Sequence, residues 1–291
     1  MARVIAVGVA TVDIVNEVAQ YPVENAEVRA LGHWVRRGGN ATNTLVVLSQ
    51  LGHRCEWAGV WTDGASGEVV RSDLSRHSVE MRYCQKISDA QMPTSYITVS
   101  RASGSRTIVH CRHDVPEYRA SSFANIPLDE FDWIHFEARN IPETRRMMDR
   151  VKQHKPTLPV SIEIEKPREC VESLFPNASL LLFSKAFADA SGTTAESLLH
   201  SVRGMAPNAN LVCSLSERGA VGLCKAGGLW YAPACLPAQV IDTVGAGDTF
   251  NAAMIDAMLR GESLVSSLRF ACALAGQKCG RQGLHGLHRP A

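Results

Sequence analysis

The chain has 291 residues, of which 45% are hydrophobic and 20% are charged, and its formal net charge is +1. This length allows one large α/β domain or two small ones, and the composition is ordinary for a globular protein. The nearly neutral charge argues against nucleic acid or an anionic membrane as a partner, and no apolar run approaches the length of a membrane span. We therefore expect neither partner.

The N-terminal residues have some features of a short signal peptide. One basic residue, Arg3, precedes a brief apolar run at residues 4–12, and Asp13 follows. We interpret the run as a buried first strand. The nine cysteines contain no C-x-x-C pair and no zinc-like spacing, so we expect reduced thiols in a cytoplasmic protein.

Asp13 stands where the first predicted strand ends. The carboxyl ends of strands are where α/β proteins place ligand contacts. An isolated Asp at such a point is more often a turn or capping residue. Both interpretations therefore stay open for Asp13 until other parts of the chain are considered.

Two segments, residues 14–36 and 92–112, carry alternating β-forming residues around turns. This pattern predicts two hairpins, which we expect to form a small antiparallel lid. Arg106 directly follows the Gly-containing loop of the second hairpin. An exposed Arg is usually a solvated charge, but on a lid it can also reach a phosphate.

Between the hairpins, two glycines precede a predicted helix that ends near Gly52. Asn40 and Asn43 lie three residues apart, so both face the same way in its first turn. Two amides can donate to and accept from hydroxyl groups, which suits a sugar. The alternative is that Asn40 only caps the helix.

From residue 133 onward, predicted strands and helices alternate. This order is typical of a parallel sheet with helices on both faces. Neither a Walker A sequence nor a full G-x-G-x-x-G motif is present, so a P-loop nucleotidase and a Rossmann dehydrogenase are not indicated.

Residues 241–250 contain a predicted strand end, a Gly-Ala-Gly turn and the start of a mostly apolar helix. A helix start presents unpaired N–H groups, which makes it a natural anion site. Asp248 at this point is electrostatically awkward unless it takes a proton as a general base. The alternative is that Asp248 caps the helix.

Together these motifs resemble the ribokinase-like (PfkB) carbohydrate kinases, and within that family the ketohexokinases. The resemblance covers essentially the whole chain. The similar stretches are residues 21–29, 37–43, 102–108, 133–135, 163–169, 242–252 and 278–280. The resemblance implies one ribokinase-like α/β domain over residues 1–291, a three-layer α/β/α sandwich with a mainly parallel sheet and the small antiparallel β lid.

The resemblance also implies an activity: ATP-dependent transfer of a phosphoryl group to a hydroxyl of a ketose such as fructose, with Mg²⁺. It implies Asp248 as the base and the amides of Gly245, Ala246 and Gly247 as the anion hole. The sugar would be held by Asp13, Gly39, Asn40 and Asn43. The nucleotide and its phosphates would meet Arg106, Ser216, Glu217, Arg218, Gly219, Cys272 and Gly276. Lids of two subunits would clasp each other, which gives a homodimer.

Two departures from the family pattern matter. Residues 184–187 lack the Asn-x-x-Glu motif that many relatives carry near the metal, and few acidic residues besides Asp248 are obvious ligands. We therefore expect Mg²⁺ to bind mainly through phosphates and water, with its protein ligands undetermined. On the lid, Asn25 stands where the ketohexokinases present an aspartate toward the sugar, and an amide can donate as well as accept.

Two alternatives to a ketose kinase remain. One is a kinase for another small acceptor, such as ribose, a nucleoside or a sugar acid. The other is a sugar or nucleotide sensor that performs no catalysis, since fold alone does not settle function. An intact Asp248 argues against the sensor, because a sensor needs no base.

Overall fold

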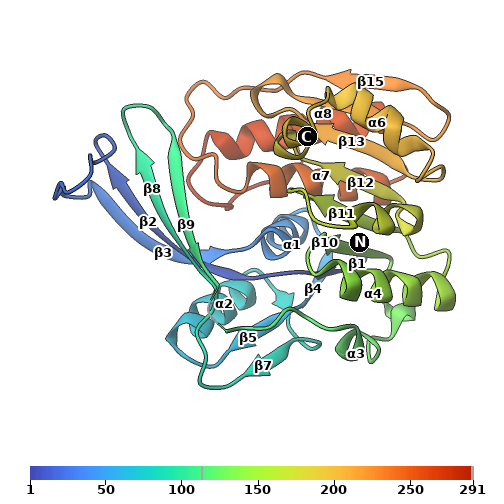
Figure 1. The fold of residues 1–291 in the computed structure, drawn as a ribbon, viewed down its shortest axis with the longest axis horizontal. Helices are drawn as coiled ribbons and strands as arrows, with labels where there is room; N and C mark the ends of the chain where they lie inside the picture. The colour runs from blue at the N-terminus through green and yellow to red at the C-terminus, as the bar shows by residue number, and fades with distance from the viewer. Residues whose placement is uncertain (113, 290–291) are drawn as a thin grey trace.

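Short apolar runs form the strands of the central sheet. In the computed structural model, which describes residues 1–112 and 114–289, nine strands pair in the order β15-β14-β13-β12-β11-β10-β1-β4-β6 (Figure 1). Their bounds are β1 Arg3–Val7, β4 Arg54–Ala58, β6 Val79–Glu80, β10 Trp133–Glu137, β11 Val160–Ile164, β12 Leu180–Phe183, β13 Asn210–Ser214, β14 Ala220–Leu223 and β15 Leu229–Ala232. The strands from β6 to β13 are parallel, and β14 and β15 are antiparallel.

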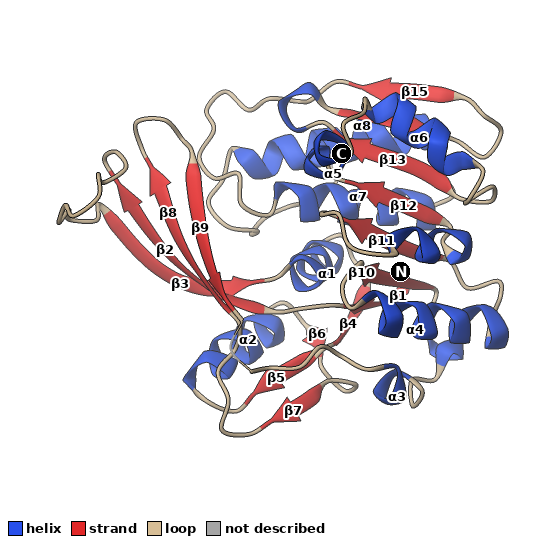
Figure 2. Ribbon diagram, in the orientation of Figure 1, coloured by secondary structure: helices blue, strands red, loops and turns tan. Residues whose placement is uncertain are grey.

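Helices cover both faces of this sheet, which gives the three layers seen in Figure 2. One core contains Leu45, Met254 and Leu268 from α1, α7 and α8, and the other contains Met147 and Leu199 from α4 and α6. The helix bounds are α1 Asn40–Gln50, α2 Ala65–Arg76, α3 Ala120–Phe123, α4 Ile141–His154, α5 Lys185–Ala190, α6 Ala195–Arg203, α7 Ala246–Leu259 and α8 Leu264–Cys279. The expected three-layer α/β/α sandwich with a mainly parallel sheet is confirmed. Within the described ranges, no helix combines the length and apolar character that crossing a membrane requires.

The described residues also form five smaller elements. They are the parallel pair β5 and β7 and three 3₁₀ helices. Their bounds are β5 Val60–Thr62, β7 Gln85–Ile87, η1 Leu128–Glu130, η2 Val171–Asn177 and η3 Ser216–Arg218.

A separate four-stranded sheet projects from the body of the molecule (Figure 1). Its strands are β2 Thr11–Val18, β3 Gly32–Gly38, β8 Thr94–Ser100 and β9 Arg106–Cys111, in the order β3-β2-β8-β9. Each predicted hairpin is antiparallel, and the two hairpins join through a parallel pairing of β2 with β8. This sheet is called the lid below.

Two local expectations are wrong. Asp13 does not end the first strand, because β1 stops at Val7 and Asp13 is the third residue of lid strand β2. Gly8 follows the end of β1, and an added Cβ there would lie 2.3 Å from the Glu137 carboxylate, so a larger residue does not fit. Residues 240–242 do not form a strand either. They belong to the connection from β15 to α7, where Ile241 N donates to Cys279 O at 2.8 Å instead of joining a ladder.

Candidate active site

A cleft of about 590 Å³ lies between the lid and the carboxyl end of the main sheet. Its walls come from the lid strands, from the first turns of α1 and α7, and from the ends of β10, β11 and β12. It is lined in part by Asp13, Gly39, Asn40, Asn43, Arg106, Ser216, Gly245, Gly247 and Asp248. Since the carboxyl ends of parallel strands form the ligand-binding edge of α/β sheets, this is the candidate active site.

The start of α7 forms one end of the cleft. Gly245 occupies the cap position with φ of 84°, a left-handed conformation that glycine adopts without strain. No side chain caps this helix. Asp248 lies in the first turn, only 6% exposed, and its Oδ2 accepts from Asn43 Nδ2 at 2.6 Å. The capping alternative for Asp248 is therefore wrong.

The pKa of the Asp248 carboxyl group is raised toward neutral pH. Burial raises the pKa of its carboxyl group to about 7, with the negative charges of Glu137 and Glu165 adding to the rise. The hydrogen bond from Asn43 and the charge of Arg37 oppose it. A carboxylate with a pKa near the working pH has the property that a general base needs.

The polar residues predicted to hold a sugar lie near Asp248. Asp13 Oδ1 accepts from Thr11 Oγ1 at 2.9 Å, and burial raises the pKa of Asp13. Gly39 has φ of 103°, and an added Cβ would lie 2.2 Å from Val9 O, so only glycine fits there. The structure therefore brings Asp13, Gly39, Asn40, Asn43 and Asp248 into one cleft, as the sequence predicts.

Three carboxylates in the cleft were missed by sequence reasoning. Glu137, at the end of β10, accepts from Val9 N at 2.6 Å and Ala41 N at 3.1 Å, and burial raises its pKa to about 7. Glu163 and Glu165 accept from Asn40 Nδ2 at 3.2 and 3.4 Å. Both Glu137 and Glu163 lie near strand ends, which was the available signal. The cleft therefore holds three carboxylates in addition to Asp13 and Asp248.

The Glu163 carboxylate is incompletely satisfied. Its Oε2 is buried without a hydrogen-bond partner, and burial together with the charge of Asp248 raises the pKa of Glu163 well above its ordinary value. A buried carboxylate oxygen with no donor is suited to a hard cation such as Mg²⁺. No cluster of three or more potential ligands that could hold a metal by itself occurs in the described parts of the chain.

Basic side chains line the cleft as well. Arg106 from β9 reaches the connection before α7, where its guanidinium donates to Thr243 Oγ1 at 2.6 Å. Four further cations at the cleft were also missed, namely Arg139, Lys166, Arg168 and Lys185. Arg139 follows β10 and Lys166 and Arg168 follow β11, while Lys185 opens α5 after β12. Such a set of cations can neutralise the phosphates of a nucleotide.

The other predicted nucleotide residues are distributed unevenly. Ser216 lines the cleft, whereas Glu217, Arg218 and Gly219 follow it in and after η3 and lie outside the lining. Cys272 and Gly276 lie on α8 outside the lining, and Cys272 Sγ donates to Ala232 O at 3.7 Å. Ala246 and Asn25 also lie outside the lining, and Asn25 is exposed in the β2–β3 turn.

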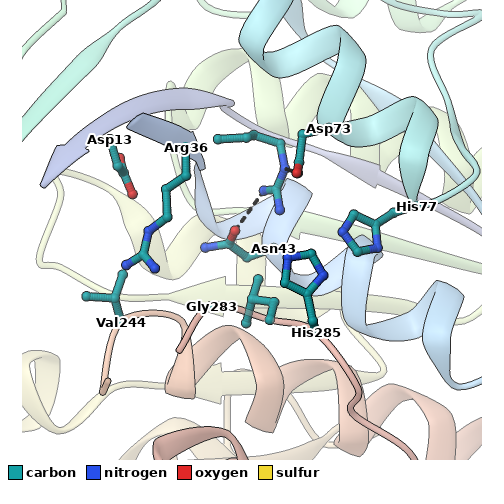
Figure 3. Close-up of a pocket in the computed structure, with 10 residues that line it drawn as sticks. Asp13, Arg36, Asn43, Asp73, His77, Val244, Gly283 and His285 are labelled. Atoms are coloured by element: carbon teal, nitrogen blue, oxygen red, sulfur yellow. Dashed lines mark hydrogen bonds and ion pairs between the residues drawn. The ribbon is translucent and has the colours of Figure 1, made fainter. Parts of the chain in front are cut away.

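A smaller pocket of about 60 Å³ adjoins the cleft and shares Asp13, Asn43 and Val244 with it (Figure 3). Arg37 crosses its wall, donating to Asp73 at 2.7 Å and to Asn43 Oδ1 at 2.7 Å. The pocket is completed by Arg36, His77, Gly283, Leu284 and His285, and the two imidazole rings are stacked with centroids 5.1 Å apart. Charges of both signs line it, so it carries no clear preference for an anion.

Comparison with known proteins agrees with this geometry. Residues 1–288 match the pfkB family carbohydrate kinases, and the chain belongs to this family. It is 38% identical to mouse ketohexokinase over 98% of each chain, and 23% identical to Bacillus subtilis ribokinase over 93% of this chain and 90% of the relative.

Solved structures share the fold at low sequence identity. A putative ribokinase from Agrobacterium tumefaciens superposes with a TM-score of 0.86 at 20% identity, covering 99% of this chain and 94% of its own. Arabidopsis thaliana ribokinase, solved with ribose and ATP, gives a TM-score of 0.78 at 19% identity and covers 97% and 94%. The chain is an ATP-dependent sugar kinase of this family.

Proposed function

We propose that this kinase transfers the γ-phosphoryl group of ATP to a hydroxyl of a ketose such as fructose, with Asp248 as the general base. The observation that carries the proposal is the setting of Asp248. Its carboxylate is buried at the start of α7, is oriented by Asn43 at 2.6 Å and has a pKa raised to about 7. The 38% identity to a protein named ketohexokinase supports a ketose as acceptor.

The acceptor hydroxyl binds beside Asp248 in this mechanism. As its oxygen forms the bond to phosphorus, its proton passes to Asp248 and the bond to the ADP oxygen breaks. Asn43 donates to one carboxylate oxygen and leaves the other for the proton. Asp13, Gly39 and Asn40 hold the remaining hydroxyls, and this positioning supplies much of the catalysis, because phosphoryl transfer requires little covalent chemistry from the protein.

The anion hole uses the first amides of α7. The N–H groups of a helix's first turn lack intrahelical acceptors, so those of Gly245 and Gly247 are suited to a phosphoryl oxygen. Ala246 N donates weakly to Thr243 O, at 3.3 Å. Its amide joins the anion hole only when that contact is exchanged for one to the phosphoryl group.

ATP binding rests on the basic side of the cleft. Arg106 meets the phosphates, and the segment Ser216–Gly219 flanks the nucleotide, with Cys272 and Gly276 behind it shaping the wall. Glu163 and Glu165 have the hard oxygen atoms that would hold Mg²⁺, and the unpartnered Glu163 Oε2 supports this choice. When bound, the ion neutralises phosphate charge.

A homodimer through the lid is part of the proposal. Cross-strand pairing aligns Val35, Ile14, Tyr96 and Val109 in one row on a single face of the lid. Three of these side chains are 48–64% exposed, whereas their neighbours Asp13 and Ser95 face the cleft. An apolar row of this kind supports contact with a second subunit. In that dimer we propose that Asn25, at the lid turn, approaches a sugar.

The test is ADP release over a panel of acceptors, in which we expect ketoses to be favoured. We also propose that the kinase is cytoplasmic. The panel includes fructose, ribose, a nucleoside and a sugar acid, and Asp248→Asn is compared with Asp129→Asn at an exposed site. We expect Asp248→Asn to lose roughly 10²–10⁴-fold in turnover while still binding sugar, and Asp129→Asn to lose nothing. Near-parent turnover in Asp248→Asn would refute the mechanism, and preference for another acceptor would refute the ketose.

A further inference from the structure

One residue of the connection that leads into α7, Asp242, accepts hydrogen bonds from four different donors. Asp242 lies three residues before the helix cap Gly245, and its carboxylate and carbonyl accept from separate parts of the chain. The donors are Lys278 Nζ on α8, Gly283 N after α8, Arg36 on lid strand β3 and Val244 N within the connection itself. These contacts make Asp242 the junction between α8, the lid and the turn.

Lys278 is the unusual member of this junction. Its side chain is fully buried, and its ammonium lies 2.6 Å from Asp242 O and 3.1 Å from Asp242 Oδ2. A buried lysine is uncommon and is tolerated only when its charge is paired. Among the described residues, Lys278 forms an ion pair with Asp242 and with no other carboxylate, so its charge is directed at the connection before α7.

Asp242 passes this restraint to the turn. Its Oδ1 accepts from Val244 N at 2.9 Å, and Val244 immediately precedes the left-handed Gly245 that opens α7. The direction of the following amides depends on the backbone at these two residues. An error of about 1 Å in such a group is enough to reduce a reaction rate strongly.

Both lid hairpins contact the same connection. Arg36 from β3 lies 3.1 Å from Asp242 Oδ2, and Figure 3 shows it extended toward Val244. Arg106 from β9 donates to the next residue, Thr243, at 2.6 Å. The lid therefore forms hydrogen bonds with two consecutive residues, Asp242 and Thr243, which precede the proposed anion hole.

We propose that Lys278 is a positioning residue for phosphoryl transfer, because its buried ammonium fixes Asp242 and thereby the amides that open α7. Arg36 and Arg106 come from the lid and contact the same connection, so the position of these amides also depends on the position of the lid. This inference rests on the proposed function, since it assigns those amides to the transferred phosphoryl group. Lys278 touches no reacting atom and acts through Asp242.

The experiment combines kinetics with hydrogen–deuterium exchange of the full chain. We expect Lys278→Met to lower kcat by about tenfold or more, with KM for the sugar within about twofold. Exchange in the peptide covering residues 241–250 rises, while exchange in α1 stays unchanged. The matched control, Gln277→Met on the neighbouring position of α8, alters neither quantity.

Asp242→Asn keeps the shape of the side chain and provides a second variant if Lys278→Met does not fold. It is expected to show the same two effects. If both residues act through one contact, the double variant should be no less active than the less active of the two single variants. Unchanged kcat and unchanged exchange in either folded single variant would overturn the proposal.

The exchange measurement needs no turnover. A parent enzyme that phosphorylates nothing in the acceptor panel would refute the proposed function. The response of residues 241–250 to Lys278→Met would still decide whether Lys278 positions the turn.

Discussion

Replacing the buried Asp248 carboxylate by an amide should stabilise the protein at alkaline pH while removing its activity. Burial raises the pKa of Asp248 from 3.8 to about 7. Between these values the folded chain keeps a proton that the unfolded chain has released. The free energy of unfolding therefore falls as pH rises through this window, and the loss is complete above the folded pKa.

The size of this effect follows from the two pKa values. A difference of roughly 3 pH units corresponds to about 4 kcal/mol at about 1.36 kcal/mol per unit. Between about 1 and 2 kcal/mol of that is already lost at pH 5, so about 2–3 kcal/mol remains to be lost between pH 5 and pH 8. An amide at position 248 does not ionise, and its oxygen still accepts from Asn43, so Asp248→Asn avoids this loss.

The assay is urea unfolding of both proteins at pH 5 and pH 8 without ligands. We subtract the free energy of unfolding of the parent from that of Asp248→Asn at each pH. This difference should be about 2–3 kcal/mol larger at pH 8 than at pH 5. The exposed-site control Asp129→Asn should show the same small difference at both values. A stability difference for Asp248→Asn that does not change with pH, or that falls as pH rises, would refute the assignment of a raised pKa to this carboxyl.

Three further predictions concern the lid. Arg106→Ala should raise KM for ATP and lower kcat by about tenfold or more, whereas Arg101→Ala on the same hairpin should leave both unchanged; normal ATP kinetics in Arg106→Ala would return Arg106 to a solvated charge. Tyr96→Lys should convert a dimer to a monomer in light scattering, while Tyr231→Lys, exposed on β15, should not; a monomeric parent would contradict the lid interface. Asn25→Asp should change the ratio of kcat/KM between fructose and other acceptors, because a carboxylate only accepts hydrogen bonds; an unchanged ratio across the panel would exclude Asn25 from acceptor choice.

Much of the site was predictable because its residues occupy positions that the fold repeats. Gly39, Asn40 and Asn43 open one helix, and Asp248 opens another. Helix starts at the ligand-binding edge of a parallel sheet converge in space, so local patterns were enough to bring these residues together. Asp13 also lines the cleft, but the sequence placed it at the end of the first strand, whereas it belongs to lid strand β2. The close approach of Gly8, which lies between β1 and β2 in the chain order, to Glu137 is a contact between residues far apart in sequence.

The electrostatics of the cleft could not be read from the sequence. Glu137 and Glu163 lie on adjacent strands, yet 26 positions separate them along the chain, and only the β10–β11 pairing brings both to the cleft. Their mutual repulsion and that of Asp248 raise the pKa of Glu163 in addition to burial. The contact of Lys278 with Asp242 depends in the same way on where α8 ends.

In the proposed function the two faces of the lid strands have different roles, one in acceptor binding and the other in subunit contact. Successive side chains of a strand point to opposite faces. Asp13 and Arg36 are a cross-strand pair on the cleft side, while the next pair, Ile14 and Val35, lies in the apolar row. A shift of one residue in this register would exchange the two faces. An insertion within β2 should therefore abolish sugar binding and dimer formation together, whereas substitutions in the apolar row should first affect the dimer.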